Sequence, residues 1–330
     1  MKGNRFYKDR PCCDKNRIRN YFKCKVAFTL PIAILPCYNL IMLECVPNFS
    51  EGEDTSLVDQ IVSAVKTARI LDVHSDPDHN RTVVTMVGET KEVKKAAYDL
   101  TLRAMQLLEV EGHQGVHPFI GVMDVIPFIP LVDSNMAEAV KTAQELVREL
   151  WEKLKLPVYF YGEAALIAER KDLPYVRKGG FAALKEEISD AHRRPDVGEG
   201  LHVTAGAVAV GARNFLIAYN INLKTRDLDI TRSIAKNIRE KHGGLAGVKA
   251  LGLELKSRGI TQVSINITDH KETSLRHVFD EVKFWAREYG VEIVESELVV
   301  MIPREAVFPE MKDYLKMHNF SESKVIENNL

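Results

Sequence analysis

The chain has 330 residues, 45% of them hydrophobic and 28% charged, and its formal net charge is −1. This length suits one large domain or two of ordinary size. Glycine and proline together account for only 32 residues, which excludes a fibrous or low-complexity protein, and the near-neutral total charge gives no support for nucleic-acid binding.

The first 41 residues differ in composition from the rest of the chain. They hold nine Lys or Arg and two Asp or Glu, so they carry +7 and the other 289 residues carry −8. Four of the five cysteines also lie there, which leaves Cys45 alone in the remainder. A remainder with one cysteine cannot form an internal disulfide, and this suits a reducing cytosol.

The same 41 residues contain basic residues followed by the apolar run Val26–Leu35, which is the order found in a signal peptide. The run is too short to span a membrane comfortably, and Pro31 interrupts it. We therefore predict that residues 1–41 are an upstream extension outside the native fold, which would begin at Met42. A targeting peptide and a small separate domain are the alternatives.

From Met42 to the middle of the chain, strand patterns alternate with helix patterns. Apolar and β-branched runs predict strands at 42–47, 70–73, 82–87, 124–130 and 158–161. Apolar residues at helical spacing predict helices at 57–68, 93–108 and 134–154, with Ser134 as the N-cap of the third. Pro127 and Pro130 predict that their strand lies at a sheet edge or contains a bulge.

The second half begins with a broken pattern between residues 163 and 203, which predicts short helical pieces and a polar loop. Strands at 205–210 and 214–220 are then separated by only three residues, which predicts a hairpin. Further helices are predicted at 228–240 and 275–289, and further strands at 249–255, 262–267 and 294–301. The tail after Pro309 is predicted as a short amphipathic helix with a frayed polar end.

Several neighbouring strands in this order are joined by turns too short for a parallel crossover. The sequence therefore favours an α+β fold, with mixed or antiparallel sheets covered by helices on one face, over a doubly wound parallel sheet. We predict two such subdomains, at 42–224 and 225–330. No apolar stretch after residue 41 has the length of a membrane span.

Two familiar motifs are incomplete in this sequence. The segment Gly206–Arg213 has the glycine spacing of a P-loop, but Ala212 and Arg213 replace its Lys and Ser or Thr, which argues against nucleotide binding. His113 and His117 have the outer spacing of a zinc-protease helix. They lack the intervening Glu, and the following proline disfavours helical geometry.

A loop between two predicted strands carries His74, Asp76, Asp78 and His79, which could supply metal ligands. Aspartate and asparagine are equally typical of residues that cap and turn a loop. We therefore predict no metal.

Three polar clusters interrupt the apolar strands, at 48–52, 74–81 and 113–124. Polar loops at strand ends are where binding and catalytic sites usually form. Among them His117 stands between Gly115 and Pro118, which constrain the backbone on both sides. Because histidine titrates near neutrality, it can accept a proton and return it. His117 is therefore the candidate general base.

Several motifs in register resemble glutamate formiminotransferase, the amino-terminal part of formiminotransferase–cyclodeaminase. They are Glu44–Gly52, Asp76–Thr82, and Gly115–Pro118 with the Gly121-x-x-Asp124-x-x-Pro127-Phe-Ile-Pro130 that follows. Residues 206–215, continued by Leu216-Ile-Ala-Tyr-Asn-Ile-Asn222, resemble the folate-binding segment of that family. The resemblance runs from Met42 to about Pro303, and no cyclodeaminase region follows, so a stand-alone form is expected.

The resemblance implies transfer of the formimino group from N-formimino-L-glutamate to N5 of tetrahydrofolate, with release of L-glutamate, in histidine degradation and one-carbon metabolism. The implied fold is two ferredoxin-like subdomains whose sheets face one another, with helices on the outer faces and folate between the sheets. The implied protein is a cytoplasmic homodimer. It acts on small molecules, with folate bearing a polyglutamate tail or none, and it has no metal, nucleic-acid or membrane partner.

The resemblance also assigns roles to individual residues. His117 falls on the family's catalytic histidine. Arg81 and Arg213 could bind substrate carboxylates, because a guanidinium fork matches a carboxylate. Small residues in the folate segment would let a flat ring lie close to the backbone. The full set for folate is Gly206, Ala207, Val208, Ala209, Val210, Gly211, Ala212, Arg213, Asn214 and Phe215, and further substrate contacts are expected from Asn48, His74, Asn80, Arg81 and Asp124.

Three positions depart from the pattern common in the animal enzymes. Val116 replaces a Glu, Phe119 replaces an Arg, and His74 replaces an Asp. Loss of an Arg removes one possible carboxylate contact, so the donor half of the site is altered while the folate half is kept. The alternatives are therefore a different one-carbon donor, a non-catalytic folate-binding protein and, third, a metal-dependent hydrolase.

Overall fold

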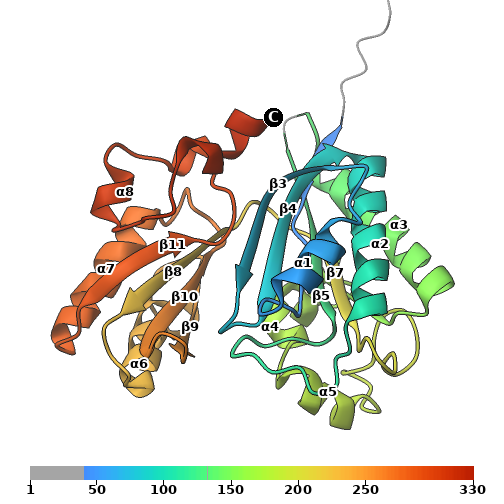
Figure 1. Cartoon of the computed structure of the whole chain (residues 1–330), viewed down its shortest axis with the longest axis horizontal. Helices are drawn as coiled ribbons and strands as arrows, with labels where there is room; N and C mark the ends of the chain where they lie inside the picture. The colour runs from blue at the N-terminus through green and yellow to red at the C-terminus, as the bar shows by residue number, and fades with distance from the viewer. Residues whose placement is uncertain (1–40, 132) are drawn as a thin grey trace, which may run out of the picture. The chain divides into compact units, whose positions relative to one another are not determined.

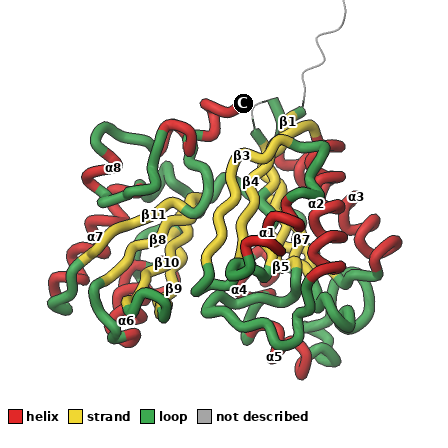
Figure 2. The backbone as a smooth tube through the Cα atoms, in the orientation of Figure 1, coloured by secondary structure: helices red, strands yellow, loops and turns green. Residues whose placement is uncertain are grey.

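The computed structural model describes residues 41–131 and 133–330, which form two β-sheets with helices against them. The predicted upstream extension lies outside the described residues. The sheets face each other and the helices lie on their outer sides (Figures 1 and 2). This confirms the predicted α+β class with two facing sheets.

The first sheet has seven strands and is mixed, because its first four positions pair antiparallel and its last three pair parallel. In space the order is β3, β4, the pair β1 and β2 end to end, β5, β7 and β6. The strands are β1 (Met42–Cys45), β2 (Asn48–Phe49), β3 (Arg69–Asp76), β4 (Arg81–Glu89), β5 (Met123–Pro130), β6 (Val158–Gly162) and β7 (Val208–Ala212).

Helices α1 (Thr55–Val62), α2 (Thr90–Leu107) and α3 (Met136–Leu154) cover the outer face of this sheet. Each turns an apolar stripe inward, for example Ala139, Ala143 and Leu146 of α3, as the helical spacing predicts. The short helices α4 (Leu173–Val176) and α5 (Gly180–Glu187) lie within the broken region at 163–203.

The second sheet has four antiparallel strands in the order β11, β8, β10, β9. Its strands are β8 (Ile217–Leu223), β9 (Val248–Leu255), β10 (Ile260–Ile267) and β11 (Ile293–Leu298), with helices α6 (Leu228–Ile238) and α7 (Leu275–Glu288) and the single turn α8 (Met311–Tyr314). Successive residues of β8 point to opposite faces of this sheet. Tyr219 and Ile221 pack into the core with α6 and α7, whereas Asn220 and Asn222 lie on the opposite face.

Both sheets are built on the same connection order, strand, helix, two strands, helix, strand, in which the first and third strands are adjacent in the middle. In the second sheet this unit is complete as β8-α6-β9-β10-α7-β11. In the first it runs from β1 to β5, and β6 and β7 extend it. This is the ferredoxin-like topology, so the predicted architecture of each half is confirmed.

The predicted hairpin between residues 205 and 220 is wrong. β7 lies between β5 and β6 in the first sheet, whereas β8 belongs to the second sheet. Only Arg213–Leu216 separates them, so this short linker carries the chain from one sheet to the other. A short turn in sequence fits a change of sheet as well as a hairpin, because it fixes chain direction only locally. The subdomain boundary at residue 224 stays a prediction.

Other details also differ from the predictions. β5 is an inner strand rather than an edge, but the alternative prediction of a bulge is confirmed, because its register with β2 shifts by one residue between Met123 and Val125. Pro127 lies opposite the interruption between β1 and β2. Asn135, not Ser134, caps α3, since its side chain accepts a hydrogen bond from Glu138 N at 3.1 Å. The end of the chain is not frayed: Val325 and Ile326 are buried.

None of the helices in the described part of the chain is both long enough and apolar enough to cross a membrane.

Candidate active site

A cleft with a cavity volume of about 130 Å³ lies between the two sheets. The three polar clusters predicted from sequence meet in it, and the linker at residues 213–216 and strands β8 and β10 complete its wall. Neither subdomain forms the site alone. Side chains that line it and matter below are Asn48, His74, Asp76, His79, Arg81, His117, Arg177, Arg213 and Asn220.

Asp124 is fully buried and binds two arginines that line the cleft. Its carboxylate accepts hydrogen bonds from Arg81 Nη1 at 2.7 Å, from Arg177 and from the backbone N–H of Ile120 at 3.1 Å. Burial alone would raise the pKa of Asp124, but the charges of Arg177 and Arg81 outweigh it and lower the pKa below its usual value. Asp124 is therefore ionised and holds two arginines in place.

Arg81 is itself fixed from two sides. Its Nε and Nη2 donate to Asn48 Oδ1 at 3.0 and 2.8 Å, and the Asn48 amide donates to the carbonyl of Val46 at 2.7 Å. Burial, chiefly, lowers the pKa of Arg81 to about 10, so the guanidinium remains protonated at neutral pH. Two arginines thus share one carboxylate, and this end of the cleft carries net positive charge.

The loop that bears His117 rests on the loop at residues 76–81. Gly115 packs so closely against the carbonyl of His79 that a Cβ atom would lie 2.3 Å from the oxygen. Asn80, at φ +46°, ties three loops together: its Oδ1 accepts from Gly52 N at 2.9 Å, and its amide donates to the carbonyl of Gln114 at 2.8 Å. The backbone around His117 is therefore fixed by glycine and asparagine, as the predicted constraint implied.

His117 is half-buried, and its Nδ1 lies 2.8 Å from the carbonyl oxygen of Pro118. A carbonyl only accepts hydrogen bonds, so Nδ1 carries the proton and Nε2 keeps its lone pair. Burial lowers the pKa of His117 well below 6.5, and the charges of Arg81 and Arg177 lower it further. At neutral pH the ring is therefore a neutral base with one free nitrogen.

His79, which the sequence marked only as a possible metal ligand, is buried beside His117, with 6.0 Å between the ring centroids. Its Nε2 lies 2.9 Å from Oε1 of Gln262 on β10, and the Gln262 amide donates to Asn222 Oδ1 at 3.0 Å. His79 thus joins the His117 loop to the second sheet.

Sequence reasoning also missed Arg177 and the polar face of the second sheet. Arg177 follows α4 in the broken region, where no local pattern marks it. Asn220, Asn222 and Gln262 did leave a signal, because each alternates with buried apolar residues along its strand.

The glycines of the predicted folate segment are not among the residues that line the cleft. Gly206 has φ +72°, and a Cβ there would lie 2.5 Å from the carbonyl oxygen of Ile120. A Cβ on Gly211 would lie 2.2 Å from the carbonyl oxygen of Tyr161. These glycines let β7 pack between its neighbours. Of the ten residues in the segment, Arg213 alone lines the cleft, and the assignment of the segment to folate stays a prediction.

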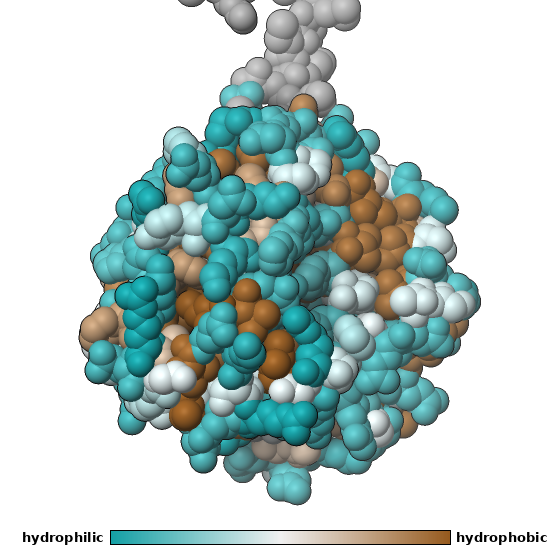
Figure 3. All heavy atoms as spheres, turned by 60° about the vertical axis from the view of Figure 1, so that its left-hand side comes forward, coloured by the Kyte–Doolittle hydropathy of each residue, from teal (hydrophilic) through white to brown (hydrophobic). Residues whose placement is uncertain are grey.

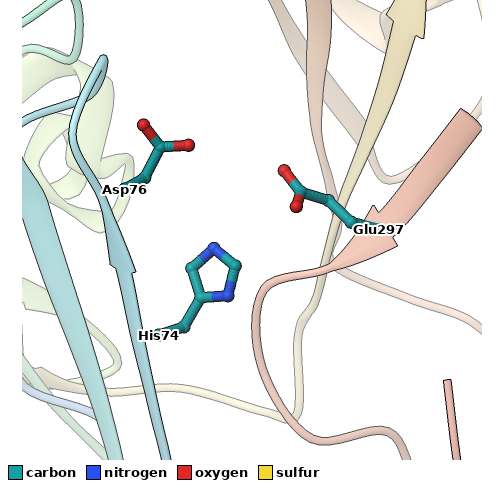
Figure 4. A group of neighbouring side chains, drawn as sticks. All are labelled: His74, Asp76 and Glu297. Atoms are coloured by element: carbon teal, nitrogen blue, oxygen red, sulfur yellow. The ribbon is translucent and has the colours of Figure 1, made fainter. Parts of the chain in front are cut away.

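One group of side chains in the described residues has the composition of a partial metal site. A ligand atom from each of His74, Asp76 and Glu297 lies within 4.8 Å of the other two (Figure 4). His113 is not part of it and packs edge-on against Phe119, with 4.6 Å between ring centroids. The absence of a metal stays a prediction.

Comparison with known proteins gives consistent matches over the chain after residue 41. Residues 42–213 match the family model of the formiminotransferase domain, N-terminal subdomain, and residues 218–329 match that of the formiminotransferase domain. The junction between the two matches coincides with the linker between the sheets.

Individual relatives show the same similarity. A glutamate formimidoyltransferase of Thermoplasma acidophilum is 40% identical over 294 residues, covering 88% of this chain and 97% of that protein. A glutamate formimidoyltransferase of Streptococcus pyogenes is 37% identical, covering 88% and 98%. The formimidoyltransferase-cyclodeaminase of Sus scrofa is 40% identical over 289 residues, and this chain spans 53% of it.

Proposed function

The chain belongs to the formiminotransferase family, and from that premise we propose that it transfers the formimino group of N-formimino-L-glutamate to N5 of tetrahydrofolate and releases L-glutamate. The protein would act as a transferase with tetrahydrofolate as co-substrate and without a metal. The observation that carries the proposal is His117, a neutral imidazole whose Nε2 has no hydrogen-bond partner among residues 41–131 and 133–330, in a cleft with net positive charge.

The reaction needs one proton moved between two nitrogens. N5 must lose a proton as it attacks the amidine carbon, and the departing glutamate nitrogen must gain one. A single imidazole with a free Nε2 can take the first proton and deliver it to the second nitrogen, a contribution of about 10²- to 10⁴-fold. His117 would hold that proton between the two steps.

The substrates carry several carboxylates, two on the donor and more on the folate tail. Arg213 lines the cleft and forms no ion pair within 4.0 Å among residues 41–131 and 133–330. Its guanidinium is thus available to a substrate carboxylate, whereas Arg81 and Arg177 add positive charge while fixed by Asp124. Asn48 and Asn80 would act by holding Arg81 and the loops in place.

The experiment that tests the function measures glutamate release from N-formimino-L-glutamate in the presence and absence of tetrahydrofolate. We expect release only with tetrahydrofolate. His117→Ala should lose at least about 10²-fold in turnover while tetrahydrofolate still binds, because a general base acts mainly in the transition state. A variant with near-normal turnover would leave the proposal without its base. If the wild-type protein binds tetrahydrofolate but transfers nothing, it is a folate-binding protein.

A different one-carbon donor was suggested by Phe119, which stands where the animal enzymes commonly carry an Arg. Phe119 packs against His113 and stacks on Phe181, with 6.4 Å between the latter ring centroids, and is not among the cleft residues. Of the three departures from the animal pattern, His74 lines the cleft and Val116 and Phe119 do not, so Phe119 gives no evidence for a different donor. Assays with other formimino compounds would detect a different preference.

We also propose that the protein is a cytoplasmic homodimer. The exposed aromatic residues Phe284 on α7 and Tyr289 directly after it, 51% and 40% exposed, support a subunit contact. Figure 3 turns the left-hand side of Figure 1 forward and shows apolar patches on an otherwise hydrophilic face. Measuring the mass in solution of the wild type and of Phe284→Ser tests this: a dimer that becomes a monomer supports it, and a monomeric wild type contradicts it.

A further inference from the structure

Three polar side chains form a row across the inner face of the second sheet. Asn222 on β8 stands opposite Glu295 on β11 and opposite Gln262 on β10 in the strand register. Gln262 has no exposed surface, and Asn222 is almost fully buried. Buried amides in folded proteins have hydrogen-bond partners for their polar atoms. The row supplies partners for the amide nitrogen of Gln262, and His79, which follows a strand of the first sheet, is the partner of its oxygen.

The direction of each hydrogen bond in this row follows from its carboxylate end. Burial alone would raise the pKa of Glu295, but hydrogen bonds from Arg258 and Asn222 lower the pKa below its usual value, so this carboxylate only accepts. Asn222 therefore donates its amide to Glu295 at 3.0 Å, and its oxygen accepts from the Gln262 amide at 3.0 Å. The Gln262 oxygen then faces His79 Nε2 at 2.9 Å, so that nitrogen donates and carries the proton.

His79 connects this row to the loop that bears His117. The carbonyl oxygen of Asp78 accepts a hydrogen bond from Val116 N at 3.2 Å, and the carbonyl oxygen of His79 lies against Gly115. The two residues directly before His117 thus rest on the backbone of the turn between β3 and β4. The side chain in that same turn is held by the second sheet.

A second contact holds this turn against the second sheet. Asp78 accepts hydrogen bonds from Ser257 N at 2.9 Å and from Ser257 Oγ at 2.5 Å. Ser257 lies in the turn between β9 and β10, and Figure 1 shows this hairpin beside the turn that joins β3 and β4. One hairpin therefore binds two successive residues, Asp78 and His79, and a turn held at both residues is fixed in position and in direction.

From this geometry we propose that Gln262 is a positioning residue for the reaction, which acts on His117 through His79. The proposal rests on the proposed function. Gln262 is not among the residues that line the cleft, so its effect on turnover is indirect. A general base works only within hydrogen-bond reach of its proton, and a displacement of about 1 Å costs about 10²-fold in rate. The second sheet thus sets the position of a base that the first sheet carries.

Two substitutions of His79 separate positioning from proton transfer by this residue. In the proposed role the ring donates one hydrogen bond to Gln262 and does not change its charge. Glutamine at position 79 offers an amide N–H for the same bond but has no titratable group. Phenylalanine keeps the shape of the ring and offers no donor. His79→Gln should therefore retain the activity that His79→Phe loses.

The test measures kcat and KM for formimino transfer, together with tetrahydrofolate binding. We expect Gln262→Met and His79→Phe each to lower kcat by about 10- to 100-fold, with tetrahydrofolate affinity within about threefold of wild type. His79→Gln should keep kcat within about threefold of wild type. Because Gln262 and His79 belong to different halves of the chain, a folding defect in one variant leaves the other informative.

Lys249→Met is the matched control. Lys249 on β9 also forms a polar contact with the first half of the chain, an ion pair with Asp172, but their side chains are 45% and 53% exposed. Exposed ion pairs contribute little, so kcat of this variant should stay within about twofold of wild type.

The imidazole resonances of His117 give a readout that does not depend on turnover. In NMR spectra of protein with isotope-labelled histidine, these resonances should shift in Gln262→Met and stay in place in Lys249→Met. His79 of the wild type should show the tautomer with its proton on Nε2.

The outcomes separate this proposal from the function. A folded Gln262→Met protein with the kcat of wild type and unmoved His117 resonances would overturn the proposal. A His79→Gln protein as impaired as His79→Phe would also overturn it, because His79 would then carry a proton. If the wild type releases no glutamate, the proposed function fails, and the His117 resonances alone decide whether Gln262 positions that ring.

Discussion

Replacing Asp124 with asparagine tests how much of the cleft depends on one buried charge. The substitution keeps the shape of the side chain and removes the charge that Arg81 and Arg177 share. Both arginines then face a neutral amide in a place where their side chains are only 8% and 12% exposed. Removing one partner from a buried ion pair costs about 3–5 kcal/mol, because the remaining charge is left without compensation.

That loss is measurable by thermal unfolding. For a chain of this size, 1 kcal/mol shifts Tm by about 2–4 °C, so Asp124→Asn should lower Tm by roughly 6–20 °C. Because the pKa of Asp124 is lowered in the fold, its contribution is present at neutral pH and is lost only as the pH falls through that lowered pKa. The difference from wild type should therefore persist at pH 6–8 and shrink in acid.

The control is Asp99→Asn, which breaks a pair with Lys95 one turn away on the exposed side of α2. Such a pair contributes about 0.3–0.5 kcal/mol, so Tm should fall by no more than about 2 °C. If the Tm of Asp124→Asn equals that of Asp99→Asn, the buried carboxylate is not what holds the arginines.

Three further expectations follow from single residues. Gly206→Ala should lower the free energy of urea unfolding by more than about 2 kcal/mol, because the new Cβ would meet the Ile120 carbonyl and φ is positive. Gly200 is also at positive φ but has open space around it, so Gly200→Ala should show the cost of the backbone conformation alone, about 1 kcal/mol. Burial raises the pKa of Glu44 to about 7, so the stability that its protonated form gives the fold is complete below pH 4.5 and is lost as the pH rises through 7. The free energy of unfolding of Glu44→Gln should therefore gain about 3 kcal/mol over that of wild type between pH 4 and pH 8. Parallel curves of unfolding free energy against pH for the two proteins would contradict the burial of Glu44. Since the pKa of His117 is lowered, kcat/KM should stay constant down to pH 6.5 and fall only below it, and a midpoint above 6.5 would be inconsistent with this site.

The candidate site was predictable where its residues are adjacent in sequence. His117 between Gly115 and Pro118 was visible because the backbone constraint and the chemistry lie in one segment. Of the groups that lower its pKa, Arg81 was also singled out, but burial and the charges of Arg177 and His79 were not visible as its neighbours, since they reach it from other loops. Their effect on His117 depends on distance and burial, and neither can be calculated before the chain is folded.

The glycines of the segment at 206–215 show a second limit. A glycine marks a place where no side chain fits, but the sequence does not say what fills the space. Here a Cβ would meet the backbone of Ile120, which precedes β5, and that of Tyr161 on β6. The resemblance to a folate segment and the demands of strand packing produce the same residues.

By itself the sequence determined the strands and helices, because the period of apolar residues fixes which face of each element can be buried. It also determined the α+β class, and it singled out His117, which lines the cleft. The tertiary structure alone decided that Arg213–Leu216 crosses between sheets, that Asp124 serves two arginines, and that Asp76 meets Glu297. Those pairings join residues that are up to 221 positions apart in the chain. Local patterns carry no information about them, because electrostatic and packing energies depend on distance in space.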